Sequence, residues 1–380
     1  MATVEKDGLF ADMGANFFCA DGKLVKRYAK ELSIPYYTLS KKEEWYVIKD
    51  GLLTKSRSLT YVENWWESLK FVLRAFQHRT SVYDLNDSSG TTTTAKEASL
   101  LLGNSFHEYV TESHVRALMF YDSSFLPEQF LWSNMWQGIR YAFGKRRVLP
   151  HVADLPLALA KRVYVKHETV EKVAVQKNGV VVATNSSEEL FDTTIIAAGI
   201  PSETISGAPD AAALLASVRY APTIVAAYKI PAETLSFCSM IGVPFSENKI
   251  ISIITNEGRK LTTQGEAIMG VALHEEAIAE LGGMSDEAVD ARLRKELALL
   301  IPQVQPLART MPLFALKRWE GAIPKYPPAY VQKVQTFWRE HQGKQNIYLT
   351  GDYMNHTFVE GAITSGLRVV ELIKNKTSTN

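Results

Sequence analysis

One stretch near the carboxyl end, Asn346–Ile373, most constrains what this chain can fold into; it reads NIYLTGDYMNHTFVEGAITSGLRVVELI. It begins with a short apolar run typical of a buried strand, turns at Gly351-Asp352, and continues through a short loop into a long amphipathic helix. Four apolar residues of that helix follow the spacing of one buried face, namely Ile363, Leu367, Val370 and Ile373. We therefore expect a strand–turn–helix unit with one face of the helix buried.

Small residues crowd the start of this helix, as Glu360-Gly361-Ala362 and then Ser365-Gly366. Glycine costs a helix interior about 1 kcal/mol relative to alanine, so two glycines so close together need a physical reason. A ligand that approaches the backbone is one reason, because a helix start offers free N–H groups and a partial positive charge to an electron-rich group. Tight packing of the helix on a sheet is the other, and the residues leave both open.

Composition excludes several classes of protein. A chain of 380 residues suggests two domains or one large discontinuous domain. The net charge of +1, without a block of like charges, gives no indication of a nucleic-acid or anionic-membrane partner. Cys19 and Cys238 are far apart, as expected for buried thiols in a reducing compartment, and the 8 histidines show no metal-binding spacing. We find no signal pattern or apolar run of about 18 residues, and so expect a cytoplasmic protein without a membrane span or a metal.

The strand–GDY–loop–VEGAITSG–helix segment resembles the flavin-binding segment at the carboxyl end of the FAD-dependent amine oxidase, protoporphyrinogen oxidase and phytoene desaturase superfamily. The resemblance implies that the turn lies against the phosphate and ribityl chain of FAD. It also implies that the helix start points at the pyrimidine edge of the isoalloxazine, where its positive end would stabilise the reduced anion. The implied cofactor-binding residues of this segment are Gly351, Asp352, Val359, Glu360, Gly361 and Ala362.

Three further segments support the resemblance. The first, Asp12-Met13-Gly14-Ala15, is similar to an element that brings the backbone, here Gly14 and Ala15, close to the flavin ring. The second is a hairpin around Asn178-Gly179 followed by the apolar run TIIAAG, in which the valine matching Val170 reads the adenine through its backbone. The third, KRWEGAIPKYPP, places Trp319 near the cofactor. On the residues alone, each also fits an ordinary glycine turn, strand valine or domain-junction tryptophan.

The resemblance also reveals an absence. Family members begin with a βαβ unit that carries G-x-G-x-x-G and, about 20 residues later, an acidic residue for the adenosine ribose. This sequence contains no such turn, so about the first 40–50 family residues lack a counterpart. An internal methionine taken as the start, a truncation, and a split gene whose partner chain supplies the unit all remain open. We expect the chain alone to bind FAD poorly.

The expected architecture is α/β. A discontinuous, Rossmann-like FAD-binding domain of the p-hydroxybenzoate hydroxylase type, truncated at its N-terminus, would comprise residues 1–22, 147–214 and 317–380. An α+β substrate domain would comprise residues 23–146 and 215–316. Within the substrate domain we predict a mostly helical, aromatic-rich region at 35–146, strands at Thr223–Ile230 and Ile250–Thr255, and a helix at Ser285–Ile301 capped by Ser285.

The resemblance implies an FAD-dependent oxidoreductase in which a largely apolar small molecule gives a hydride to flavin N5. Amine oxidases proper usually carry a lysine that holds a water at N5, whereas this sequence has Thr223-Ile224-Val225 there and Lys229 out of register. This departure favours a dehydrogenase or desaturase reaction. The alternative is a flavin-free binding protein on the same scaffold, as Rab GDP-dissociation inhibitors are. No catalytic residue is assigned. The resemblance implies that His356 lies near the flavin, whereas a lone loop histidine is by itself expected to be a surface residue.

Overall fold

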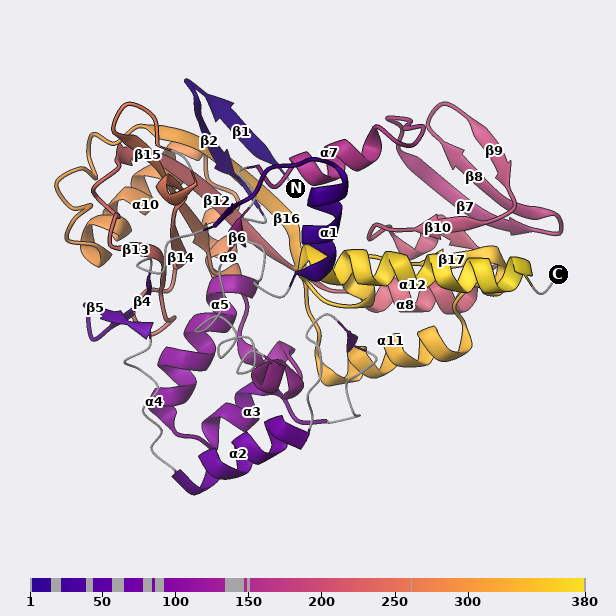
Figure 1. Cartoon of the computed structure of the whole chain (residues 1–380), viewed down its shortest axis with the longest axis horizontal. Coiled ribbons are helices and arrows are strands. Elements are labelled where there is room, and N and C mark those ends of the chain that lie inside the picture. Colours follow the sequence, from indigo (N-terminus) through magenta and orange to yellow (C-terminus); the bar gives the residue numbers. More distant parts are fainter. Residues whose placement is uncertain are drawn as a thin grey trace.

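The computed structural model describes residues 2–14, 22–38, 44–56, 65–77, 84–85, 92–133, 147–148, 151–260 and 262–378. In Figure 1 the large sheet and the helix α10 lie at the left of the molecule. A small pair of parallel strands lies at the right, beside the long helix α12. Short 3₁₀ turns connect several elements: η4 (Ser123–Phe125), η5 (Ser202–Thr204), η6 (Glu257–Arg259), η7 (Glu275–Ala277), η8 (Lys344–Asn346) and η9 (Asp352–Met354).

The largest sheet has seven strands in the order β16-β12-β15-β14-β13-β4-β5. Their bounds are β16 (Leu313–Pro324), β12 (Tyr220–Pro231), β15 (Glu266–Leu273), β14 (Ile251–Asn256), β13 (Cys238–Gly242), β4 (Glu44–Lys49) and β5 (Leu52–Lys55). Neighbouring strands are antiparallel except β13 and β4, which run parallel. The predicted strands at Thr223–Ile230 and Ile250–Thr255 are thereby confirmed.

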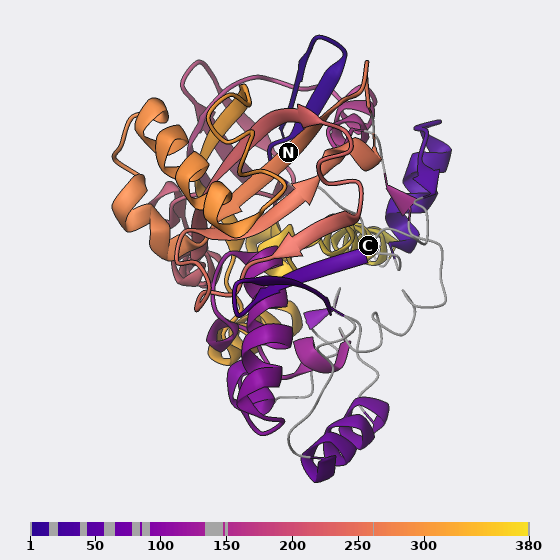
Figure 2. The ribbon, with the colours of Figure 1, turned by 90° about the vertical axis from the view of Figure 1, so that its left-hand side faces the viewer.

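Helix α10 (Asp286–Leu300) covers one face of this sheet, as Figure 2 shows. Its side chains Val289, Leu293 and Leu297 are fully buried in a cluster with the sheet. The hydroxyl of Ser285 accepts a hydrogen bond from the N–H of Ala288 at 3.3 Å, which is the predicted N-cap. The short α9 (Ile278–Leu281) precedes it.

The opposite face is covered in part by a hairpin of β1 (Thr3–Lys6) and β2 (Leu9–Asp12). Asp7 and Gly8 turn it with φ of 53° and 70°, a left-handed pair suited to glycine. The carboxylate of Asp12 accepts from the buried ammonium of Lys260 at 2.7 Å, and Lys260 also contacts Glu257 at 2.7 Å. These three buried charged groups link the hairpin to the segment that follows β14.

The region 35–146 mixes strands and helices, so the prediction that it is mostly helical is wrong for residues 37–38 and 44–55. That part forms β3 (Tyr37–Thr38), β4 and β5; β3 pairs with β6 (Arg147–Val148). Pairing of β4 with β13 buries Val47 and Ile48, a tertiary gain that local sequence does not reveal. Helices follow: α2 (Trp65–Gln77), α3 (Ala95–Leu100), α4 (Asn104–Phe106), the π-helix η3 (His107–Glu112) and α5 (Ser113–Met119). Residues 134–146 lie outside the described residues.

A four-stranded sheet has the order β11-β7-β8-β9, with β11 (Ile205–Ser206), β7 (Val170–Gln176), β8 (Gly179–Thr184) and β9 (Glu188–Phe191). It contains the predicted hairpin, whose turn ends at Gly179 with φ of 150°. A Cβ at Gly179 would lie 2.5 Å from the carbonyl oxygen of Phe191, so this turn requires glycine.

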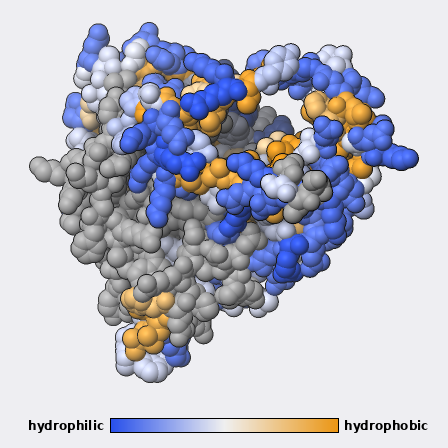
Figure 3. All heavy atoms as spheres, turned by 45° about the vertical axis from the view of Figure 1, so that its right-hand side comes forward, coloured by the Kyte–Doolittle hydropathy of each residue, from blue (hydrophilic) through white to orange (hydrophobic). Residues whose placement is uncertain are grey.

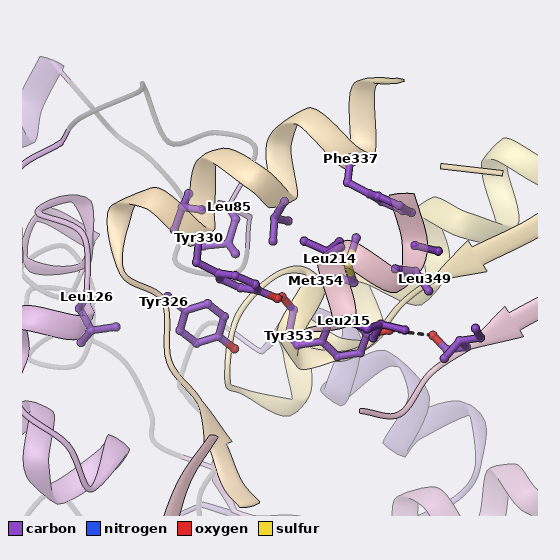
Figure 4. Packing of buried hydrophobic residues seen from close by; sticks show 14 of the residues in the cluster. Leu85, Leu126, Leu214, Leu215, Tyr326, Tyr330, Phe337, Leu349, Tyr353 and Met354 are labelled. Carbon is purple, nitrogen blue, oxygen red and sulfur yellow. Dashed lines mark hydrogen bonds between the residues drawn. The ribbon is translucent and has the colours of Figure 1, made fainter. Parts of the chain in front are cut away.

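A third sheet consists of two short parallel strands, β10 (Thr194–Ile196) and β17 (Ile347–Leu349). Helices α8 (Pro209–Ser217) and α11 (Pro328–Glu340) pack on one side of it in a shared cluster, with Ile196 and Leu349 at its centre. Figure 4 shows α11 contributing Tyr330 and Phe337 to that cluster. Helix α12 (Val359–Ser378) runs beside the strands (Figure 1).

The expected buried face of α12 is wrong in detail. Ser365 and Val369 are fully buried, whereas Val370 is 40% exposed. Ile363, Leu367 and Ile373 are only partly buried. The reason is that the small side chain of Ser365 lets the helix approach β17, with its hydroxyl 2.8 Å from that of Thr350, and the bulky positions are thereby turned partly outward.

Two helices cover the first turn of α12. Val25 and Ala29 of α1 (Lys23–Glu31) and Leu155 of α7 (Asp154–Ala160) form a cluster against which Val359 and Ile363 pack. Among the described residues, no helix is long and apolar enough to cross a membrane.

Candidate functional site

The two parallel strands β10 and β17 end at the same place, with the N–H of Thr350 donating to the carbonyl of Ile196 at 2.9 Å. Gly351 follows with a φ of +128°. A Cβ there would lie 3.2 Å from the carbonyl oxygen of Ala197 and 3.1 Å from the ring of Tyr353, so only glycine fits. The crevice outside the carboxyl ends of parallel strands is where ligands bind in α/β folds.

Three aromatic side chains fix the backbone of η9. The carbonyls of its residues Asp352, Tyr353 and Met354 accept hydrogen bonds from Tyr326 (2.9 Å), Tyr330 (2.8 Å) and Trp338 (3.1 Å) respectively. Figure 4 shows Tyr326 and Tyr330 lying beside this segment. The turn is therefore held from one side by buried donors before any ligand arrives.

Asp352 supplies a carboxylate to this crevice. One of its oxygens accepts from the N–H of Tyr353 at 2.8 Å. Desolvation raises the pKa of its carboxyl group to about 6, and its charge helps to raise the pKa of the nearby Tyr220 hydroxyl. A partly buried carboxylate with a free acceptor capacity is suited to a ligand hydroxyl group.

His356 is buried, with 4% exposure, so the expectation of a surface residue is wrong. Its ring is stacked on Phe130 at a centroid distance of 5.6 Å and on Tyr326 at 5.3 Å. Burial lowers the pKa of its imidazole to about 3, so it is neutral at pH 7. Phe130 and Tyr326 come from other parts of the chain, which is why the loop sequence did not indicate burial.

The start of α12 packs tightly on this loop. A Cβ at Gly361 would lie 2.4 Å from the carbonyl oxygen of His356, a distance that real Cβ atoms do not reach. Gly366 is less constrained, because its Cβ would lie 3.8 Å from the nearest atom, the hydroxyl oxygen of Thr350. Gly361 is thus explained by tight packing, the second of the two reasons left open, although the helix start packs here on the backbone of the preceding loop and not on a sheet.

Glu360 has a structural partner. Its two carboxylate oxygens accept hydrogen bonds from the N–H groups of Leu24 (2.7 Å) and Val25 (2.9 Å), at the start of α1. The side chain is 6% exposed. It therefore caps α1 across more than three hundred residues of sequence, a role that its position in VEGA did not indicate. Val359 and Ala362 lie beside it, partly buried, in the same first turn.

The remaining predicted residues form two other groups. The indole N–H of Trp319 donates to the carbonyl of Met13 at 2.6 Å, and a Cβ at Gly14 would lie 3.5 Å from the indole ring. Gly14 and Trp319 thus lie together, while Ala15 is outside the described residues. Val170 is 39% exposed on β7, in a different sheet from the crevice (Figure 1).

Tyr220 was not predicted. Its hydroxyl oxygen would lie 3.0 Å from a Cβ at Gly199, just after β10, and its own Cβ would lie 3.2 Å from one at Gly321 on β16. It therefore stands between the crevice and the strand that carries Trp319. The one signal in the sequence was Gly199 itself, a glycine at the end of a parallel strand.

These residues fit one part of an FAD molecule. The carboxylate of Asp352 suits a ribityl hydroxyl, and the start of α12 suits the electron-rich edge of the ring. A glycine-rich turn for the pyrophosphate is absent from the sequence. In the part of the chain that the structure describes, no group of three or more His, Cys, Asp or Glu could hold a metal ion.

Solved structures share this fold. Cyclohexylamine oxidase from Brevibacterium oxydans IH-35A has a TM-score of 0.73 at 12% identity, with 97% of this chain and 88% of that chain covered. A protein described as a protoporphyrinogen oxidase from Exiguobacterium sp. 255-15 has a TM-score of 0.72 at 13% identity, covering 99% and 90%. A fatty acid isomerase from P. acnes that produces CLA has a TM-score of 0.67 at 12% identity, covering 98% and 89%.

The comparison with curated sequences gave no match. A sequence profile described as flavin containing amine oxidoreductase matches residues 1–374, nearly the whole length of the chain. The match includes the GDY turn and the VEGAITSG helix start, which the structure places together at the crevice. The chain belongs to the flavin-containing amine oxidoreductase family.

Proposed function

We propose that this chain forms the greater part of an FAD-dependent oxidoreductase that removes a hydride from a largely apolar small molecule. The observation that carries the proposal is the strand–turn–helix arrangement at Gly351-Asp352, where the ends of β10 and β17 lie beside α12 and the hydroxyls of Tyr326 and Tyr330 hold the turn. A turn held by such hydrogen bonds can position a cofactor with little further ordering.

The roles of the residues follow from their chemistry. Asp352 would accept a hydrogen bond from a ribityl hydroxyl, and the N–H groups at the start of α12 would stabilise the electron-rich part of the ring. Gly14, Trp319 and the backbone of Val170 would hold other parts of the cofactor. When bound, FAD supplies the hydride acceptor at N5. The protein's own contribution is to orient the ring and the substrate and to exclude water.

The reaction that we propose is a dehydrogenation or desaturation. At the position where amine oxidases usually carry a lysine, Thr223 is buried and its hydroxyl donates to the carbonyl of Leu273 at 2.8 Å. Lys229 forms a partly exposed ion pair with Glu266 at 3.1 Å. The substrates in the names of the similar structures, cyclohexylamine, protoporphyrinogen and a fatty acid, all carry large apolar parts, which is compatible with an apolar substrate.

The proposal includes a discontinuous FAD-binding domain, residues 1–22, 147–214 and 317–380, with residues 23–146 and 215–316 as the substrate domain. In this domain β10 pairs with β17 on one side only, as far as the described residues go. Parallel sheets are normally buried on both faces and are seldom this small. A further strand-bearing segment, from a longer form of the chain or a partner chain, would add the pyrophosphate turn along the other edge of β10.

Exposed apolar side chains support the proposal that a further strand-bearing segment packs beside β10. Ile195 in the middle of β10 is 46% exposed, and Val370 on α12 is 40% exposed. Figure 3 shows a hollow with apolar residues along its border on this side of the molecule. A charged side chain in place of Ile195 should prevent the added segment from packing, because the charge would be buried without a partner.

Substrate oxidation tests the proposed activity. The chain, co-expressed with a βαβ unit from a family member and loaded with FAD, is mixed anaerobically with apolar amines, fatty acids and tetrapyrroles. Loss of the flavin absorbance band near 450 nm, where oxidised flavins absorb, supports hydride acceptance. No loss with any of these classes, in a preparation that dithionite does reduce, contradicts it.

A flavin-free binding function is the second candidate, and the missing glycine-rich turn favours it. It predicts that the complemented protein stays colourless but binds an apolar ligand. The same preparation therefore separates the two functions.

A further inference from the structure

Helix α2 presents a set of large apolar side chains to solvent. Trp65 is 72% exposed, Trp66 51%, Leu69 44% and Leu73 53%. We call these four residues the apolar face of α2. Isolated exposed apolar residues are ordinary, but a contiguous group of this kind marks an interaction surface.

The four residues lie on one side of the helix. Successive residues of an α-helix are turned by about 100°, so Trp65, Leu69, Leu73 and Trp66 fall in that angular order within about 100° of the circumference. An apolar face of this width is broader than the narrow seam of a coiled coil. The rings of Trp65 and Trp66 are 5.5 Å apart and nearly perpendicular, which widens the face at the start of the helix.

A lysine borders this face. The ammonium of Lys70 lies 5.8 Å from the ring centroid of Trp66 and 2.6 Å from the carboxylate of Glu67. The sequence of α2 carries Lys70 and Arg74 against one acidic residue, Glu67. Tryptophans beside a lysine are the residues that proteins place at the boundary between lipid headgroups and acyl chains.

The position of α2 leaves this face accessible. Figures 1 and 2 both show α2 at one end of the molecule, and Figure 1 shows it away from β10 and β17. Figure 3 shows an apolar patch at the same end. A flat surface can therefore reach the helix without meeting the two sheets.

We propose that α2 docks this protein on the surface of a lipid bilayer, with its apolar face in the headgroup–acyl boundary and its axis parallel to the membrane. A helix of 13 residues is about 20 Å long and too short to span, but it suits interfacial binding. The apolar face supplies most of the affinity, and the single excess positive charge adds a modest preference for anionic lipid. This inference does not depend on the cofactor.

Vesicle flotation of the purified full chain tests the proposal. The vesicles are phosphatidylcholine alone and phosphatidylcholine with phosphatidylglycerol. The double substitution Leu69→Glu, Leu73→Glu should lower the partition coefficient about tenfold or more on both kinds of vesicle, because two charges replace the methyl groups that would enter the bilayer. The control pair Leu52→Glu, Leu299→Glu adds the same charge at residues 70% and 74% exposed on β5 and α10, and should change binding less than about twofold.

Circular dichroism and the melting temperature show that each variant is folded, as expected for exposed positions. The proposal is overturned if the unaltered chain stays with the buffer on both kinds of vesicle, or if the two double variants lose binding equally. It is also overturned if sedimentation shows a dimer that only the α2 variant loses, because a second copy would then cover the face.

Discussion

At the scale of single residues, the two glycines of the VEGAITSG stretch have different tasks. Gly361 lies where any side chain would meet the carbonyl oxygen of His356, whereas Gly366 has room for a methyl group. The same residue type, five positions apart in one helix, therefore predicts opposite effects of substitution.

We predict that Gly361→Val lowers the free energy of unfolding by about 1–3 kcal/mol or more through overpacking. In the complemented protein it should also lower the flavin content per folded molecule, because the helix start is displaced. Gly366→Ala is the matched control and should raise stability by about 0.5–1 kcal/mol. Melting temperature and flavin absorbance on one preparation measure both effects. Full flavin occupancy in folded Gly361→Val would remove the helix start from the site.

Asp352 should make stability depend on pH. Its pKa is about 6 in the folded protein, against an ordinary value of 3.8, so the folded state binds the proton more tightly. Its contribution to stability is therefore present at pH 4 and is lost as the pH rises to about 6. The buried histidines His274 and His356, with pKa values lowered to about 3, act in the opposite direction below their ordinary value of 6.5.

A difference measurement isolates the aspartate. Urea denaturation of the unaltered chain and of Asp352→Asn, compared at each pH, cancels the histidines. The stability of Asp352→Asn relative to the unaltered chain should rise between pH 4 and 6 and stay constant above that range. A difference that does not vary with pH would show that the carboxyl group is not desolvated.

At the scale of elements, the sequence predicted what depends on local pattern. The hairpin around Asn178-Gly179, the buried strand before Gly351 and α10 with its Ser285 cap are all present. Burial of His356 and the strand pairing of β4 could not be predicted, because both depend on partners far away in the chain. The prediction of which face of α12 is buried was wrong for the same reason, because apolar spacing identifies a face of the helix but not the segments that cover it.

The contact between α12 and α1 leads to a further prediction. Glu360→Ala removes both acceptors at the start of α1 and should cost about 0.5–2 kcal/mol, the usual cost of losing a helix cap. Amide hydrogen exchange should accelerate across residues 23–31. Glu371→Ala, an exposed glutamate on the same helix, is the control and should change neither quantity. Unaltered protection of α1 in Glu360→Ala would mean that the apolar cluster alone holds it.

At the scale of the whole molecule, a few short segments of sequence were enough to predict the fold class and the family. They did not predict every residue of the candidate site. Gly351 and Asp352 lie beside α12, and Gly14 contacts Trp319, while the binding of a cofactor by these residues stays a prediction. Glu360 proved to be a cap and Tyr220 was missed, because neither role leaves a local signature. The two-stranded parallel sheet and its exposed Ile195 agree with the absence of a pyrophosphate turn from the sequence.

The visible absorbance spectrum of the purified chain, alone and complemented by a βαβ unit, tests the central claim most directly. Residues 1–380 alone should show little flavin absorbance near 450 nm, where flavins absorb, because the pyrophosphate anchor is missing. The complemented protein should bind about one FAD per chain, and Ile195→Glu should prevent this while Leu299→Glu does not. Stoichiometric flavin in the chain alone would contradict the account of an incomplete site, and a colourless complemented protein would contradict the flavoenzyme itself.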